Sequence, residues 1–89
     1  MSQDQYQKGL GTIRSFADAT LRDRGIAAQS VQLAEQGPKR DANLSIAANG
    51  KTESEVFSYD EVTDSGEAID APTAAKVRRL VSCFIPENT

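Results

Sequence analysis

The sequence predicts an α+β domain made of a helix, a three-stranded antiparallel meander and a second helix, with both helices on one face of the sheet. Three observations support this fold class. Apolar residues recur at helical spacing near both ends of the chain. Two runs of alternating polar and apolar residues meet at Asn49-Gly50, which is a strong hairpin signal. A further alternating run over residues 30–35 precedes them, so residues 1–89 are expected to form one small domain.

The first helix is indicated by apolar residues at helical spacing, namely Tyr6, Leu10, Ile13, Phe16 and Leu21. Ser2, followed three residues later by Gln5, fits a capping box that would start this helix. Gly9 and Gly11 each cost ~1 kcal/mol relative to alanine inside a helix, so residues 1–11 could fray or the helix could begin near Thr12. Gly25 suits the left-handed position after a helix, where a Schellman motif would bring Ile26 against Leu21. These signals predict that the first helix ends just before Gly25.

The hairpin allows two registers. A two-residue turn at Asn49-Gly50 would place Glu53 opposite Ile46 and Glu55 opposite Leu44, which mixes charged and apolar groups on one face. We therefore predict a three-residue loop over residues 48–50, with Gly50 in a left-handed bulge position. This register sends four apolar residues inward, Ala42, Leu44, Ile46 and Val56, and five polar residues outward, Asn43, Ser45, Lys51, Glu53 and Glu55.

The predicted register has a consequence for two aromatic residues. Phe57 and Tyr59 would share the outward face with Glu53 and Glu55, where they could contact a partner. In the alternative, the chain twists after Val56 and Phe57 enters the core, as large aromatic side chains often do. The sequence leaves both arrangements open.

The end of the chain is predicted to form a polar connection followed by the second helix. Residues 60–69 are interpreted as the connection, because Asp64-Ser65-Gly66 is a turn signal. The helix is expected to begin near Pro72. Its apolar stripe consists of Ala74, Val77, Leu80, Val81 and Phe84, and residues 86–89 follow it as a tail.

Composition indicates a soluble cytoplasmic protein that does not enter a membrane. Hydrophobic residues make up 38% and charged residues 26% of the chain, and no apolar run approaches the ~18 residues that a membrane span needs. The first residues do not resemble a signal peptide. The single cysteine fits a reducing compartment, and Cys83 is expected to be a small packing residue of the second helix.

The residue types argue against catalysis. Without histidine, the commonest general base is missing, and one cysteine cannot complete a zinc tetrad. The carboxylates of residues 60–67 lack the spacing of a calcium loop. We therefore expect a protein that is not an enzyme and that needs no metal and no cofactor.

Charge distribution suggests a partner-binding surface. Residues 53–70 hold seven acidic residues and no lysine or arginine. Such asymmetry can steer a partner of opposite charge. The sequence therefore predicts a small inhibitor or adaptor module that binds a basic protein partner through residues Glu53, Glu55, Phe57, Tyr59, Asp60, Glu61 and Asp64. An open sheet edge could also pair two copies into a homodimer.

A second hypothesis comes from the Gly37-Pro38 turn and the order of elements, in which the chain resembles the double-stranded RNA-binding domain over residues 12–85. The lysine cluster that opens the second helix in that family is absent at residues 71–75, and the family's histidine after Gly-Pro is absent as well. With these residues missing, the resemblance implies the same fold in a protein-binding derivative or a relative that does not bind RNA. The alternative function is nucleic-acid binding through Lys39, Arg40, Lys76 and Arg79.

Overall fold

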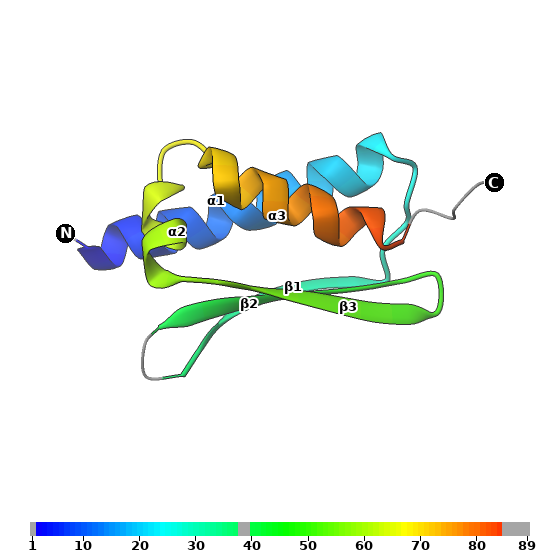
Figure 1. Ribbon diagram of the computed structural model, residues 1–89, viewed down its shortest axis with the longest axis horizontal. Coiled ribbons are helices and arrows are strands. Elements are labelled where there is room, and N and C mark those ends of the chain that lie inside the picture. Colours follow the sequence, from blue (N-terminus) through cyan, green and yellow to red (C-terminus); the bar gives the residue numbers. More distant parts are fainter. Residues whose placement is uncertain (1, 38–39, 85–89) are drawn as a thin grey trace.

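The computed structural model describes residues 2–37 and 40–84, so Lys39 and the predicted tail lie outside the described residues. The predicted α+β fold, with helices on one face of a three-stranded antiparallel sheet, is confirmed (Figure 1). A short helix that was not predicted lies between the sheet and the last helix. The elements are α1 (Ser2–Asp23), β1 (Ser30–Gln36), β2 (Asp41–Ala48), β3 (Lys51–Phe57), α2 (Tyr59–Asp64) and α3 (Ala71–Ser82).

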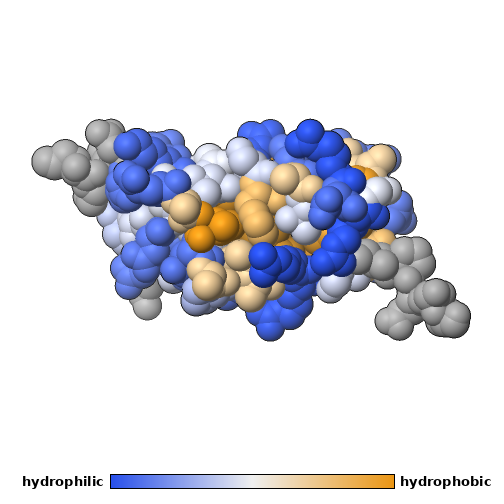
Figure 2. Space-filling view, turned by 90° about the horizontal axis from the view of Figure 1, so that it is seen from above, coloured by the Kyte–Doolittle hydropathy of each residue, from blue (hydrophilic) through white to orange (hydrophobic). Residues whose placement is uncertain are grey.

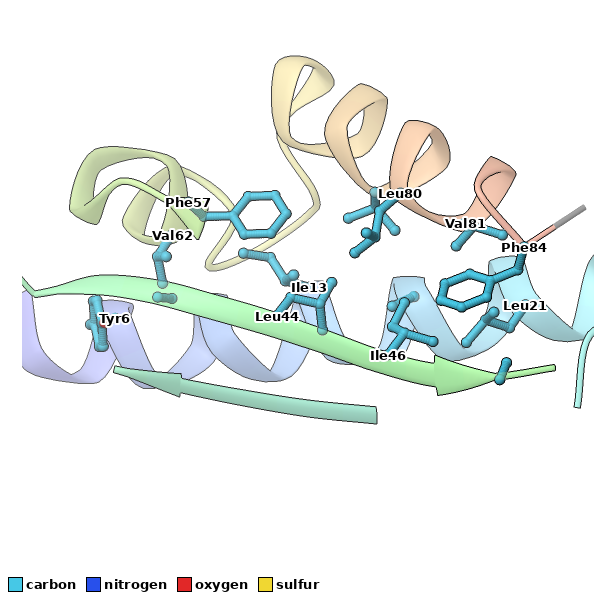
Figure 3. Packing of buried hydrophobic residues seen from close by; sticks show 14 residues of the cluster. Tyr6, Ile13, Leu21, Leu44, Ile46, Phe57, Val62, Leu80, Val81 and Phe84 are labelled. Carbon is cyan, nitrogen blue, oxygen red and sulfur yellow. The ribbon is translucent and has the colours of Figure 1, made fainter. Parts of the chain in front are cut away.

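The core lies between the sheet and the helix layer. Ala42, Leu44 and Ile46 of the central strand β2 point inward and are fully buried, as predicted. Figure 3 shows Leu44 and Ile46 beneath side chains from α1 and α3. Burying a leucine or isoleucine side chain contributes ~2 kcal/mol, so β2 anchors both layers.

Helix α1 is continuous from Ser2, so of the starts that the sequence left open it has the earliest and does not begin near Thr12. Gly9 is buried where α1 meets α2, and a Cβ atom at this position would overlap the Val62 carbonyl group, 2.6 Å from its carbon. The glycine that weakens the isolated helix therefore lets the two helices approach closely. Gly11 has open space around it.

The predicted end of α1 is confirmed. Gly25 has a φ of 72°, in the left-handed region. The Ile26 N–H donates to the Leu21 carbonyl at 2.9 Å, and the Gly25 N–H donates to the Arg22 carbonyl at 3.0 Å. These are the two hydrogen bonds of a Schellman motif, and they direct the chain from α1 toward β1.

The hairpin has the two-residue turn, so the predicted three-residue loop is wrong. Asn49 and Gly50 have φ values of 55° and 79°, and positive φ at both central residues is the mark of a type I′ turn. The Asn49 side-chain amide also donates to the Phe84 carbonyl at 3.1 Å, which ties the turn to the end of α3. As a result, Ile46 lies opposite Glu53 and Leu44 lies opposite Glu55.

This register reverses the predicted faces of β3. Phe57 is fully buried opposite Ala42, whereas Val56 is 45% exposed on the outer face. Phe57 buries more apolar surface than valine would, which favours this arrangement. Placing Glu53 and Glu55 on the inner face costs little free energy. β3 is an edge strand and both side chains are only half-buried, so their carboxylates stay in contact with water.

The outer face of the sheet carries almost no charge. The residues that alternate outward on the three strands are small or amide-bearing, with the exception of Asp41 and Val56. They include Ser30, Gln32, Ala34, Asn43, Ser45, Ala47, Thr52 and Ser54. The helix layer has a different surface, with hydrophobic groups in its middle and hydrophilic groups around them (Figure 2).

The contact between Gly9 and α2 predicts opposite effects for two neighbouring glycines. Gly9→Ala is expected to lower the free energy of unfolding by ~2 kcal/mol, because the new methyl group collides with the Val62 backbone. Gly11→Ala is expected to raise it by ~1 kcal/mol, because alanine favours the helix and meets no neighbour. Urea unfolding followed by circular dichroism measures both. A stabilising Gly9→Ala would contradict the packing of α1 on α2.

Candidate partner-binding surface

The predicted acidic surface begins on β3 and continues into α2. β3 forms one edge of the sheet, because the strand order is β1-β2-β3. Glu53 and Glu55 are half-buried on the helix side of this strand, and Asp60 and Asp64 are exposed on α2. The four carboxylates therefore follow one another along an edge of the molecule and around its corner.

Residues 60–64 are helical, so their interpretation as a polar connection is wrong. Ser58 caps α2 through a reciprocal pair of hydrogen bonds. The Glu61 N–H donates to the Ser58 hydroxyl at 3.2 Å, and the Ser58 N–H donates to Glu61 Oε1 at 2.9 Å. This capping box is visible in the sequence as Ser58 followed three residues later by Glu61, and it could have revealed the helix.

Glu61 does not belong to the free acidic surface, because it is part of an internal ion pair. Lys76 Nζ of α3 lies 2.9 Å from Glu61 Oε1 and donates a second hydrogen bond to the Val56 carbonyl at 3.1 Å. The same ammonium lies 5.4 Å from the centre of the Phe57 ring. One lysine thus joins α3, α2 and the end of β3.

The environment of Glu61 shifts its titration. Burial alone would raise the pKa of this carboxyl, but hydrogen bonds from Lys76 and Ser58 and the lysine charge outweigh burial, so the pKa is lowered. The ionised form is therefore favoured in the folded protein.

The aromatic half of the predicted surface is directed inward. Phe57 points into the core (Figure 3), so the prediction that it contacts a partner from the open sheet face is wrong. Tyr59 is half-buried and stacks on Tyr6 of α1, with ring centres 5.3 Å apart and planes 17° apart. Both aromatic residues hold the fold together at the corner where β3 meets α2.

Arg40 completes the tyrosine cluster. Its guanidinium lies 4.6 Å from the centre of the Tyr6 ring, and its Nε lies 2.6 Å from Glu35 Oε2. The Tyr6 hydroxyl donates to the Arg40 carbonyl at 2.9 Å. Burial is the main reason that the pKa of Tyr6 is raised. These contacts hold Arg40 at its φ of 60°, which is unfavourable for a residue with a side chain.

The four cations of the alternative hypothesis therefore have different surroundings. Arg40 and Lys76 already pair with carboxylates, whereas Arg79 is exposed on α3. Lys39 lies outside the described residues. The structure thus leaves two of the described cations committed to internal contacts.

The other acidic side chains of residues 53–67 form no ion pair with any residue that the structure describes. Within the described part of the chain, the ion pairs are Arg40 with Glu35 and Lys76 with Glu61. The carboxylates of residues 53–67 other than Glu61 are therefore unpaired there, namely Glu53, Glu55, Asp60, Asp64 and Glu67.

Three further features bear on function: the single cysteine, groups that could bind a metal ion and helices that could cross a membrane. Cys83 is exposed at the end of α3, so its interpretation as a packing residue is wrong. Among residues 2–37 and 40–84, no group of three cysteine, aspartate or glutamate side chains could hold a metal ion. None of the helices in this part of the chain is long and apolar enough to cross a membrane.

The lowered pKa of Glu61 predicts an acid-dependent loss of stability. Because the folded pKa lies below the unfolded one, the contribution of Glu61 is complete above the unfolded value of about 4.3 and disappears as the pH falls through the folded value. Glu61→Gln keeps an oxygen acceptor and removes only the charge. It is expected to cost ~1 kcal/mol at pH 7 and almost nothing at pH 2.5.

Urea unfolding at both pH values measures this difference. Asp60→Asn is the control, since it removes a neighbouring exposed carboxylate that has no ion pair in the described structure. An equal cost of Glu61→Gln at both pH values would contradict the stabilising role of the Lys76 pair.

No protein-family model, no curated protein and no solved structure matches the chain. The resemblance to double-stranded RNA-binding domains stays a prediction.

Proposed function

We propose that this protein is a small non-enzymatic interaction module, of inhibitor or adaptor type, that presents an acidic edge to a basic protein partner. The acidic edge consists of Glu53 and Glu55 of β3 and Asp60 and Asp64 of α2. The observation that carries the proposal is that these four carboxylates have no ion-pair partner within the described residues. Like charges held together repel one another, and a partner of opposite charge relieves that repulsion.

Backbone geometry supports the same surface. An edge strand leaves alternate N–H and C=O groups unpaired, so β3 can also offer hydrogen bonds to a partner, except at the Val56 carbonyl, which accepts from Lys76. Phe57 and Tyr59 support this edge from the inside and do not face the partner. Phe57 is buried in the core, and Tyr59 stacks on Tyr6 of α1. A rigid edge loses little conformational entropy when it binds, which favours affinity.

Charge reversal tests the acidic edge. Glu53→Lys with Glu55→Lys reverses its strand part, and Asp60→Lys with Asp64→Lys reverses its helix part. Asp23→Lys with Ser15→Lys and Ala19→Lys is the control, because together they make the same charge change on exposed residues of α1. Partners captured by the wild-type protein are identified by mass spectrometry, purified and titrated against all three variants.

Each edge variant is expected to bind the partner about tenfold or more weakly, and the control is expected to bind like the wild type. Circular dichroism confirms that the variants are folded. Raising the salt concentration should weaken wild-type binding, because exposed charges are screened. A partner that binds both edge variants with unchanged affinity contradicts the proposal.

Nucleic-acid binding is expected to be absent. Arg40 and Lys76 are paired internally, and the chain has a net charge of −3. Duplex RNA is therefore expected to show no saturable binding at low salt, where phosphate contacts are strongest. An electrophoretic mobility assay at two salt concentrations checks this. Saturable binding that weakens with salt and is lost in Arg79→Glu would instead support the resemblance to RNA-binding domains.

A further inference from the structure

A groove lies on the other side of the molecule, between the C-terminal half of α1 and the start of β1. It is open to solvent and has a volume of about 660 Å³. Half-buried or buried apolar side chains of Leu21, Ile26 and Val31 contribute to its lining. Its open shape and its mixed apolar and charged lining can accommodate an extended peptide segment.

β1 provides one wall of this groove and is the second edge of the sheet. The strand pairs with β2 on one side, and no described strand pairs with its other side. Alternate residues of β1 therefore direct their N–H and C=O groups away from the sheet. Its sequence, Ser30–Gln36, contains no proline and no lysine, the residues that commonly prevent strand addition at an edge.

The helix wall carries a row of alternating charges. Arg14, Asp18 and Arg22 are four residues apart, so they lie on one face of α1, and all three are exposed and line the groove. Four residues of helix rise ~6 Å. None of the three takes part in an ion pair within the described part of the chain.

An extended peptide matches this row in spacing. Side chains on one face of a strand are two residues apart, or ~6.7 Å. A strand lying along α1 can therefore place three successive side chains of one face opposite Arg14, Asp18 and Arg22. Figure 1 shows that α1 and the strands run along the same long axis of the molecule, which such an alignment requires.

We propose that this groove binds an extended segment of a partner protein, which adds to β1 as a fourth strand. The segment carries an acidic, a basic and an acidic residue at alternate positions, complementary to Arg14, Asp18 and Arg22. Backbone hydrogen bonds supply affinity, and the charge pattern supplies specificity.

This site is separate from the acidic edge of β3, and the inference does not rest on the proposed function. A second copy of the chain fits the groove less well. The helix-side residues of its β3 are Lys51, Glu53 and Glu55, which present a base and two acids and, set against the three residues of the row in either direction, match only one of them. We therefore assign the groove to a partner segment, and the oligomeric state of the protein alone is part of the test.

The probe is a fluorescein-labelled nine-residue peptide with Glu, Lys and Glu at positions three, five and seven and Val or Thr between them. Fluorescence anisotropy is expected to show saturable binding. Backbone amide shifts in the NMR spectrum are expected to change in β1 and not in β3. A peptide with Lys, Glu and Lys at the same positions is expected to bind about tenfold more weakly.

A charge swap tests the row directly. In the variant Arg14→Glu, Asp18→Arg and Arg22→Glu, the preference is expected to invert, so that the second peptide binds better than the first. Arg79→Glu is the control, because it changes the net charge by the same amount on a different helix and should leave the preference unchanged. All four positions are exposed, so the variants are expected to fold.

The backbone pairing needs its own control. N-methylation of the peptide at alternate residues removes the donors of one edge, and methylating one of the two alternate sets is expected to abolish binding. Sedimentation of the protein without peptide gives its mass over the same concentration range.

Four results would overturn the inference: no binding of the first peptide, no inversion of preference in the swapped variant, unchanged binding of both methylated peptides, or a wild-type oligomer that the peptide dissociates. The last result would assign the groove to a second copy of this chain.

Discussion

The turn at Asn49 and Gly50 sets the register on which the rest of the candidate surface depends. Both residues adopt positive φ, so β3 pairs with β2 without a bulge. A shift by one residue would move every side chain of β3 to the opposite face. In the observed register, Phe57 enters the core and Glu53 and Glu55 line the edge of the sheet on its helix side. Because the Asn49 amide also binds the Phe84 carbonyl, the turn further connects the hairpin to α3.

The short helix α2 converts this register into a rigid corner. Gly9 lets α2 approach α1, Lys76 connects it to α3, and Tyr59 stacks on Tyr6. A helix of only six residues is not stable by itself, so these tertiary contacts and the Ser58 capping box stabilise it. Two groups of acidic residues result at this corner. Glu61 forms an ion pair with Lys76, whereas Asp60 and Asp64 are exposed and form no ion pair within the described residues.

The two edges of the sheet differ in a way that suits an adaptor. β3 and α2 present unpaired carboxylates, whereas β1 borders a groove with two arginines and one aspartate. A small sheet with helices on one face leaves both edges accessible, because a meander of three strands has only one central strand. Two partners with different charge patterns could therefore bind at once, without either covering the other.

Local signals in the sequence were sufficient for the order of the two longer helices and the three strands, the Schellman motif at Gly25, the start of α3 near Pro72 and the inward face of β2, but α2 was missed. Each depends on neighbouring residues, through helix propensity, capping or alternation. The register of β3, the role of Gly9 and the internal use of Glu61 and Phe57 were decided by the tertiary structure. Apolar patterning on β3 was misleading, because an edge strand tolerates glutamates on its inner face and a buried aromatic residue outweighs a buried valine. The sequence by itself therefore determined the fold class and the concentration of acidic charge in residues 53–70, and only long-range packing decided which of those residues are free to meet a partner.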